Sequence, residues 1–285
     1  MKKKKLLVIL STVLAVIILM ISLVAWGNKA LELNEITIDS EKLPEAFEGF
    51  RIAHVSDLHN DEFGKDNIKL LKLIENADPD IIAVTGDIID SYTTDVEIAL
   101  SFMEKAQQIA PCYYVNGNHE GRVPDDYQTL KEGLEACGVT VLENESLLLE
   151  KAGECIRLTG VSDPGFETDY LYGDTEGVMR RHLTELIADN ENFNLLLSHR
   201  PELLGVYADF DVDLVLSGHA HGGQFRLPFV GGLYAPNQGL MPEIDAGLYT
   251  EDNTKLIVSR GIGNSLFPFR LNNRPEVILV TLEKT

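Results

Sequence analysis

Hydrophobic residues follow two different patterns along this chain, one before residue 27 and one after residue 50. The 21 residues from 6 to 26 carry no charge and follow four lysines, Lys2 to Lys5. At about 1.5 Å per helical residue, such a run spans about 30 Å, the thickness of a membrane's hydrocarbon core. We therefore predict that residues 1–27 form a single transmembrane helix that anchors the chain.

A cleaved signal peptide is the alternative interpretation of this segment. The apolar region of a signal peptide usually has about 7–15 residues and ends in small residues at a cleavage site. Here the run is longer and ends in Val24-Ala25-Trp26 without an A-x-A motif, which favours an uncleaved anchor. Because cationic flanks stay in the cytoplasm, we expect the rest of the chain on the extracytoplasmic side of the cell membrane.

After a lead-in segment at residues 28–50, short apolar runs alternate with segments whose apolar residues have helical spacing. Strands are expected at residues 52–55, 81–84, 112–115, 139–142, 147–149, 156–161, 193–197, 212–216, 254–259 and 277–282. Helices are expected at residues 68–74, 96–109, 126–137 and 176–188, and a Gly- and Pro-rich loop or hairpin at residues 222–247. This alternation is typical of an α/β fold with parallel strands, here in one domain at residues 51–285.

Five of the expected strands end in clusters of residues that are able to bind a metal ion. The clusters are Asp57-Leu58-His59, Gly86-Asp87, Gly117-Asn118-His119, Ser198-His199 and Gly218-His219-Ala220-His221. Ligands of open α/β sheets bind beyond the carboxyl ends of the strands, so we expect all five clusters in one cleft. Imidazole, carboxylate and amide donors without thiolate suit Mn, Fe or Zn. Eight donor residues exceed the needs of one tetrahedral ion, so two divalent ions are expected.

Composition narrows the function classes further. The 285-residue chain has 45 acidic and 24 basic side chains and a net charge of −21. A nucleic-acid partner is not expected, because binding to a phosphate backbone requires a basic face. The three cysteines are too few for a disulfide framework, and we expect them to act as small buried hydrophobic residues.

The ordered motifs resemble those of the calcineurin-like metallophosphoesterase superfamily, from about residue 51 to residue 282. Within it, residues 197–202, 218–224 and 260–265 are similar to the YkuE/YaeI-type branch of membrane-associated phosphodiesterases, which includes enzymes that cleave UDP-diacylglucosamine. The resemblance implies two packed mixed β-sheets flanked by helices. The chain departs from many relatives at Asn60, where glycine is frequent.

The resemblance also implies a role for each motif residue. Six residues would bind two metal ions in groups of three, namely Asp57, His59 and His221, and Asn118, His199 and His219. Asp87 would bridge the ions, and His119 would be the general acid. A metal-activated hydroxide would then hydrolyse a phosphodiester or pyrophosphate bond, with manganese as the expected metal and iron or zinc as alternatives. The expected substrate is lipid-linked or nucleotide-type and lies near the membrane.

Two other classes of function are kept as alternatives. One is a phosphomonoesterase or protein phosphatase, and the other is a non-catalytic metal-binding scaffold with the same fold. A scaffold has no need for a complete ligand set together with His119, which favours the enzyme.

Substrate contacts are the least specific part of the pattern. The candidates are Arg200, Arg260, Asn264 and Arg270. A guanidinium can bind a phosphate through two parallel hydrogen bonds, although salt bridges to nearby acids are an equal alternative for each arginine. The apolar residues at positions 225–234 form either a lip for an acyl chain or the packed face of a hairpin.

Overall fold

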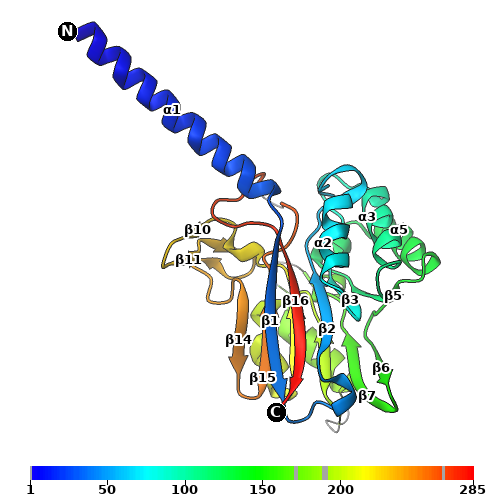
Figure 1. Cartoon of the computed structure of the whole chain (residues 1–285). Helices are drawn as coiled ribbons and strands as arrows, with labels where there is room; N and C mark the ends of the chain where they lie inside the picture. Colours follow the sequence, from blue (N-terminus) through cyan, green and yellow to red (C-terminus); the bar gives the residue numbers. More distant parts are fainter. Residues whose placement is uncertain (1, 170–172, 188–191, 265–266) are drawn as a thin grey trace.

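Two six-stranded mixed sheets form the centre of the domain in the computed structural model, which describes residues 2–169, 173–187, 192–264 and 267–285 (Figure 1). In the first sheet, β16 is antiparallel to β2 and the other neighbours are parallel. Its strands, in spatial order, are β1 (Glu32–Ser40), β16 (Glu276–Lys284), β2 (Phe50–Val55), β3 (Ile81–Thr85), β4 (Cys112–Val115) and β5 (Thr140–Val141).

The second sheet has a parallel centre and an antiparallel hairpin partner at each edge. Its strands, in spatial order, are β14 (Gly247–Glu251), β15 (Thr254–Val258), β9 (Leu214–Ser217), β8 (Asn194–Leu197), β7 (Glu154–Gly160) and β6 (Glu145–Lys151). Every residue of β3, β8 and β9 is buried, as expected for central strands whose two faces are both covered.

Helices cover the outer face of each sheet. They are α2 (Ile68–Asn76), α3 (Val96–Ala106), α4 (Asn118–Arg122), α5 (Pro124–Ala136), α6 (Thr175–Leu186) and α7 (Leu204–Asp209). Ala99, Phe102, Met103 and Ala106 form the buried face of α3 at helical spacing, and the side chain of Asp95 caps its N-terminus.

Three hydrophobic clusters give the domain a helix–sheet–sheet–helix order of layers. The cluster between the sheets joins residues of both, such as Ile52 and Leu195. A second cluster packs α2, α3 and α5 against the first sheet, with Phe102 fully buried. A third packs α6 and α7 against the second sheet. The predicted fold of two packed sheets flanked by helices is confirmed.

Most expected strands and helices are present, but the start of the sheet was predicted wrongly. The expected lead-in at residues 28–50 contains β1, which pairs in parallel with β16 from Glu32↔Glu276 to Ser40↔Lys284. The strand was missed because only Ile38 on it is buried, so its sequence lacks a continuous apolar run. Because β1 belongs to the first sheet, that sheet begins well before residue 51.

Other differences are local. The strand expected at 139–142 shrinks to Thr140–Val141, and β14 was not expected. The helix expected at 176–188 ends at Leu186, and residue 188 lies outside the described residues. The expected hairpin at 222–247 is confirmed as two small hairpins, made by β10 (Arg226–Leu227) with β11 (Gly231–Gly232) and by β12 (Tyr234–Ala235) with β13 (Gly239–Leu240).

The predicted N-terminal helix is α1 (Lys2–Lys29), which projects from one end of the domain (Figure 1). It is long and apolar enough to cross a membrane. Its most apolar part has a mean hydropathy of 3.1 and is not buried against the domain. Its last turn is fastened to the domain by Asn28, whose side chain donates to the carbonyl oxygen of Arg270 and accepts from the amide of Arg270.

Candidate metal centre

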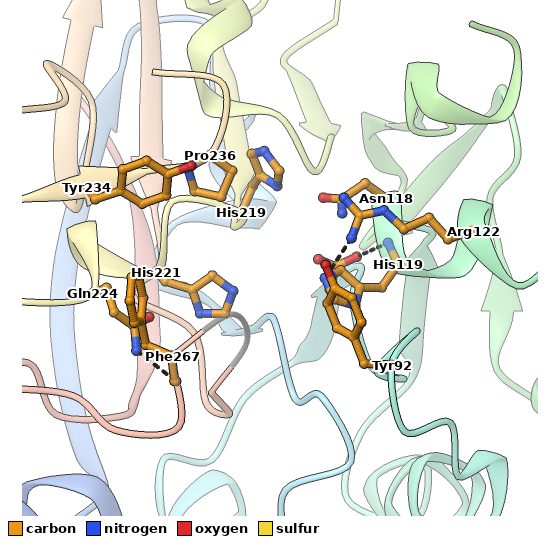
Figure 2. A pocket seen from close by; sticks show the side chains of 11 residues that line it. Tyr92, Asn118, His119, Arg122, His219, His221, Gln224, Tyr234, Pro236 and Phe267 are labelled. Carbon is orange, nitrogen blue, oxygen red and sulfur yellow. Dashed lines mark hydrogen bonds between the residues drawn. The ribbon is translucent and has the colours of Figure 1, made fainter. Parts of the chain in front are cut away.

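Loops after five strands bring the candidate residues together beside a pocket of about 160 Å³. The loops after β2, β3, β4, β8 and β9 supply Asp57, His59, Asp87, Asn118, His119, His199, His219 and His221. All eight side chains are buried. Figure 2 shows Asn118 and His119 on one side of the pocket and His219 and His221 on the other, so the two sheets each contribute one wall.

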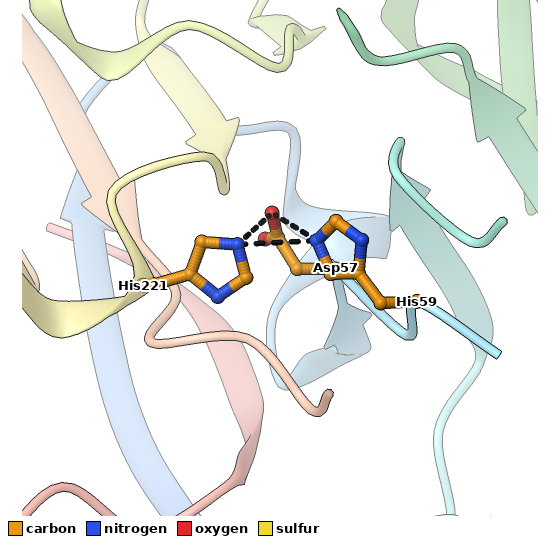
Figure 3. Close-up of side chains that lie close together, drawn as sticks. All are labelled: Asp57, His59 and His221. Atoms are coloured by element: carbon orange, nitrogen blue, oxygen red, sulfur yellow. Dashed lines mark hydrogen bonds and ion pairs between the residues drawn. The ribbon is translucent and has the colours of Figure 1, made fainter. Parts of the chain in front are cut away.

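Asp57, His59 and His221 form the first group (Figure 3). His221 Nε2 lies 3.3 Å from Asp57 Oδ1 and 3.1 Å from His59 Nε2, and His59 Nε2 lies 3.8 Å from the same carboxylate oxygen. Donor atoms that share one ion at about 2.1 Å lie roughly 3–3.5 Å apart, so these spacings suit a bound divalent cation.

Asp87, His199 and His219 form the second group, with Asn118 beside them. His199 Nε2 lies 3.1 Å from Asp87 Oδ2, 3.2 Å from Asn118 Oδ1 and 3.1 Å from His219 Nδ1. One imidazole nitrogen therefore faces three atoms that are potential acceptors.

Hydrogen bonds on the far side of the His199 and His219 rings determine which nitrogen of each ring carries the hydrogen. His199 Nδ1 lies 2.7 Å from the carbonyl oxygen of Thr85, which only accepts, so this nitrogen carries the hydrogen. His219 Nε2 lies 2.9 Å from Asn237 Oδ1 and donates to it in the same way. In their neutral form, both rings thus turn lone pairs toward Asp87, an arrangement of acceptors that a cation stabilises.

Asp87 contacts both groups. Its Oδ2 lies 3.1 Å from His199 Nε2 and 3.8 Å from His59 Nε2, whereas its Oδ1 accepts a hydrogen bond from the amide of His119 at 2.8 Å. The residues present therefore fit a dinuclear divalent site in which one carboxylate lies between the two ions.

The electrostatics of the protein alone already favour positive charge at this position. Burial disfavours the charged form of His199, yet Asp87 raises the pKa of this imidazole to about 10. Burial likewise opposes ionisation of Asp57 and Asp87, yet the neighbouring histidines hold the pKa of both carboxyls below the usual range. These buried carboxylates are stabilised by protons on the neighbouring histidines, and a metal ion would supply the same positive charge.

Unusual backbone geometry accompanies the candidate ligands. Five of them adopt a left-handed conformation with positive φ, namely Asp57, His59, Asp87, His219 and His221. This conformation costs a non-glycine residue roughly 1–2 kcal/mol and persists only where the surroundings enforce it, typically at functional sites. At Gly218, a Cβ atom would collide with the Asp57 carboxylate and the Ser56 hydroxyl, so only glycine allows the loop to approach this closely.

His119 points into the pocket and is oriented by Ser91. Its Nδ1 accepts from the Ser91 amide at 3.0 Å and lies 3.1 Å from Ser91 Oγ. The neutral ring therefore carries its hydrogen on Nε2, which lies 3.4 Å from Arg122 Nη1 at the pocket. Burial lowers the pKa of His119 to about 4, with Asp87 opposing the shift.

Glu120 holds the two loops that carry Asp87 and Asn118 in register. It is fully buried and accepts from the amides of Asp87, Ile89 and Gly117 at 2.7–3.2 Å. Burial and the nearby Asp87 raise its pKa to about 7.

The four residues expected to bind substrate do not line this pocket. Arg200 is fully buried and forms a two-point salt bridge with Asp163, at 2.5 and 2.9 Å, and a weaker contact with Glu202. Its guanidinium is already neutralised by buried acids, which supports the salt-bridge alternative over phosphate binding for this arginine.

Arg260, Asn264 and Arg270 lie on the side of the domain next to α1. Arg260 contacts the carboxylates of Glu32 and Glu276. Arg270 donates to the carbonyl oxygens of Arg260 and Gly263. The amide nitrogen of Asn264 donates to Asp61, which holds the loop in place.

Several pocket residues were not found from the sequence. They are Tyr92, Arg122, Gln224, Pro236 and Phe267, whereas Tyr234 belongs to the apolar stretch at residues 225–234 that was singled out from the sequence. Arg122 was accessible in principle, because it lies four residues after Asn118, one turn along the same helix. Pro236 and Phe267 come from irregular segments whose position no periodic pattern predicts.

Known proteins share both the sequence motifs and the fold. The family model for calcineurin-like phosphoesterases matches residues 50–223. The uncharacterized metallophosphoesterase YkuE of Bacillus subtilis is 34% identical over 90% of this chain and 86% of its own length. The phosphodiesterase YaeI of Escherichia coli is 29% identical over 82% of each chain.

A solved structure supports the fold. The protein TT1561 of Thermus thermophilus superimposes with a TM-score of 0.52 at 14% identity, covering 75% of this chain and 90% of that one. The family match over most of the domain, together with two groups of metal-competent side chains, leads to one conclusion. This chain belongs to the calcineurin-like phosphoesterase family and is a metal-dependent phosphohydrolase.

Proposed function

We propose that this protein is a dinuclear-metal phosphodiesterase. Asp57, His59 and His221 hold one ion, Asn118, His199 and His219 hold the other, and Asp87 lies between them. The observation that carries the proposal is Asp87 Oδ2, which reaches a nitrogen of each group at 3.1 and 3.8 Å. The bound ions supply an activated water and positive charge for the phosphoryl oxygens.

His119 is the proposed proton donor to the leaving oxygen. The donor is the doubly protonated ring, which gives up its Nε2 hydrogen toward the pocket and becomes neutral, while Ser91 contacts the ring from the other side. Ser91 Oγ, 3.1 Å from Nδ1, is able to accept the Nδ1 hydrogen of the doubly protonated ring, whereas the Ser91 amide donates to Nδ1 only when that nitrogen carries no hydrogen. Arg122 extends the positive surface of this wall toward the phosphate.

The proposed substrate is amphiphilic, with its phosphate at the metals and an acyl part near the first small hairpin. This hairpin adjoins the pocket through Gln224 and Tyr234, which line it. Phe225 packs against Phe267 and Phe269, at 5.1 and 5.3 Å between ring centroids, which supports the packed-hairpin interpretation for this residue. Phe229 at the turn is fully exposed, which supports the acyl-lip interpretation there.

The proposed location is a cell membrane that α1 crosses once, with residues 28–285 outside the cytoplasm. Figure 1 shows β10 and β11 at the end of the domain from which α1 emerges, so the exposed turn faces the same side as the anchor. The four lysines ahead of residue 6 favour the cytoplasm. The vertebrate relatives from zebrafish and cattle are named transmembrane proteins with a metallophosphoesterase domain, at 28% and 26% identity.

Turnover by the purified full chain tests the proposal. The chain is loaded with manganese, iron or zinc and offered a phosphomonoester, a water-soluble phosphodiester and a pyrophosphate-linked lipid at equal concentrations. We expect the diester and pyrophosphate substrates to be cleaved faster than the monoester, with manganese most active. A strong preference for the monoester would instead assign a phosphatase, and metal binding without turnover of any substrate would assign a scaffold.

A further inference from the structure

A second polar cavity lies where α1 joins the domain, and its lining residues differ from those of the catalytic pocket. It has a volume of about 420 Å³, and we name it the juxtamembrane cavity. The residues that define it here are Leu23, Val24, Trp26, Arg260, Arg270 and Arg274. Three arginines thus share one cavity in a chain whose net charge is −21.

The charges around this cavity do not cancel. Glu32 contacts Arg260 at 3.1 Å and Arg274 at 3.7 Å, and Glu276 contacts Arg260. Two carboxylates thus face the three guanidinium groups that line the cavity, and the further carboxylates that attract Arg270, those of Asp57 and Asp61, lie outside its lining. A phosphodiester would bring one negative charge into the cavity itself.

Hydrogen-bond donors are also left over. Arg270 is 1% exposed, and its Nε has no hydrogen-bond partner among the described residues. Arg274 donates through its Nε and Nη2 to the carbonyl oxygens of Ala30 and Leu31, and its Nη1 lies 3.7 Å from the Glu32 carboxylate. A buried donor without an acceptor is costly, so an anionic oxygen in the cavity would stabilise it.

The other wall of the cavity is apolar and continues into the predicted membrane span. Leu23 and Val24 belong to the last turns of α1, and Trp26 lies under the guanidinium of Arg274 at 5.0 Å. If residues 6–26 cross the hydrocarbon core, Trp26 falls at the interface, where tryptophan is enriched. The arginines then lie at the depth of the lipid phosphates.

We propose that the juxtamembrane cavity binds the phosphodiester group of a membrane phospholipid, with an acyl chain along Leu23 and Val24. The arginines recognise the phosphate and α1 recognises the chain. The inference rests on the proposal that α1 spans a membrane, and it does not depend on the reaction at the metal centre.

Lipid binding to the full chain in a neutral detergent tests this site. Trp26 is the only tryptophan, so its fluorescence reports on the cavity directly. The chain is titrated with phosphatidylglycerol, with diacylglycerol, which lacks the phosphate, and with glycerol phosphate and inorganic phosphate, which lack the acyl chains. We expect saturable binding of phosphatidylglycerol that is at least tenfold tighter than binding of any other probe.

Two substitutions with opposite expected effects make the test independent of folding defects. Arg274→Gln should weaken phosphatidylglycerol binding at least about tenfold, because it removes a charge-assisted contact. Glu32→Gln removes a competing carboxylate and should tighten binding, a gain that a damaged fold cannot produce. Arg226→Gln is the matched control, since Arg226 also pairs with an acid, Asp245, but does not line the cavity.

Three results would overturn the proposal. They are diacylglycerol binding as tightly as phosphatidylglycerol, inorganic phosphate or glycerol phosphate binding as tightly as the lipid, or affinities unchanged in both Arg274→Gln and Glu32→Gln. If the wild-type chain binds phosphatidylglycerol as expected but shows no phosphodiesterase activity, the proposed function is wrong and the lipid site is unaffected.

Discussion

The metal centre and the juxtamembrane cavity both contain buried charged side chains, but the charge that lacks a partner has the opposite sign in each. At the metal centre, carboxylate oxygens and imidazole lone pairs of Asp57, Asp87 and His199 face one another, and a cation satisfies them. In the juxtamembrane cavity, guanidinium groups outnumber carboxylates, and an anion satisfies them. Arg270 touches both, since it lines the cavity and its Nη2 lies 3.4 Å from His221 Nδ1.

The difference teaches that net charge does not predict what a buried site binds. The chain carries −21 overall, yet one site attracts cations and the other anions. The local excess of hydrogen-bond acceptors or donors determines which ligand a site binds. A buried polar group without a partner destabilises the protein, whereas the charges on the distant surface are screened by salt. A third cluster, Arg200 with Asp163, is matched internally and needs no ligand.

The largest effect is expected at the carboxylate between the two ions. Asp87→Ala should lower metal content from two ions per chain toward none and reduce turnover by more than about 10⁴-fold, because several kcal/mol of charge stabilisation are lost. Metal analysis and initial rates measure both. Asp39→Ala, an exposed acid on β1, is the control and should change neither. If Asp87→Ala still binds two ions per chain, the Asp87 carboxylate is not what holds them.

The next effect separates proton donation from metal binding within the same centre. His119→Ala should keep both ions and lose about 10²–10⁴-fold on an alkyl phosphodiester, the usual range for general-acid assistance. The loss should be much smaller on a nitrophenyl ester, whose leaving group hardly needs a proton. Equal losses on both substrates would make His119 a positioning residue.

The sequence predicted the metal-competent residues far better than it predicted the juxtamembrane cavity, for a physical reason. Each candidate ligand directly follows a buried strand, so a local pattern places Asp57, Asp87 or His199 at the sheet edge. The cavity brings residues 23–32 beside residue 260 and residues 270–274, and it depends on the parallel pairing of β1 with β16, which the sequence did not reveal. For the same reason the sequence did not reveal that Arg260 and Arg270 line this cavity and not the pocket beside the metal centre.

Disruption of the ion pair between Arg200 and Asp163 should lower the free energy of unfolding without changing substrate binding. Arg200→Met leaves Asp163 buried without its partner, and removing one member of a buried ion pair typically costs about 3–5 kcal/mol. Urea unfolding should show this loss, while the KM of the metal-loaded enzyme for a water-soluble diester stays unchanged. Adding Asp163→Asn should recover part of the stability, and a raised KM at wild-type stability would return Arg200 to the substrate site.

The smallest effect concerns the exposed turn between β10 and β11, which carries no excess charge of its own to attract a ligand. Phe229 is fully exposed at the end of the domain from which α1 emerges, so a membrane or an acyl chain is the partner it fits. Phe229→Ser should lower kcat/KM for a lipid-linked ester about tenfold, since burying a phenylalanine contributes roughly 1.5–3 kcal/mol, and should leave a water-soluble ester unaffected. The single change is sharper than one that includes Phe225, whose loss would also disturb its packing against Phe267 and Phe269. Leu148→Ser, an exposed apolar residue on β6 away from the anchor, is the matched control. If both variants cleave the lipid-linked ester at the wild-type rate, the apolar turn has no part in substrate capture, and an amphiphilic substrate loses its local support.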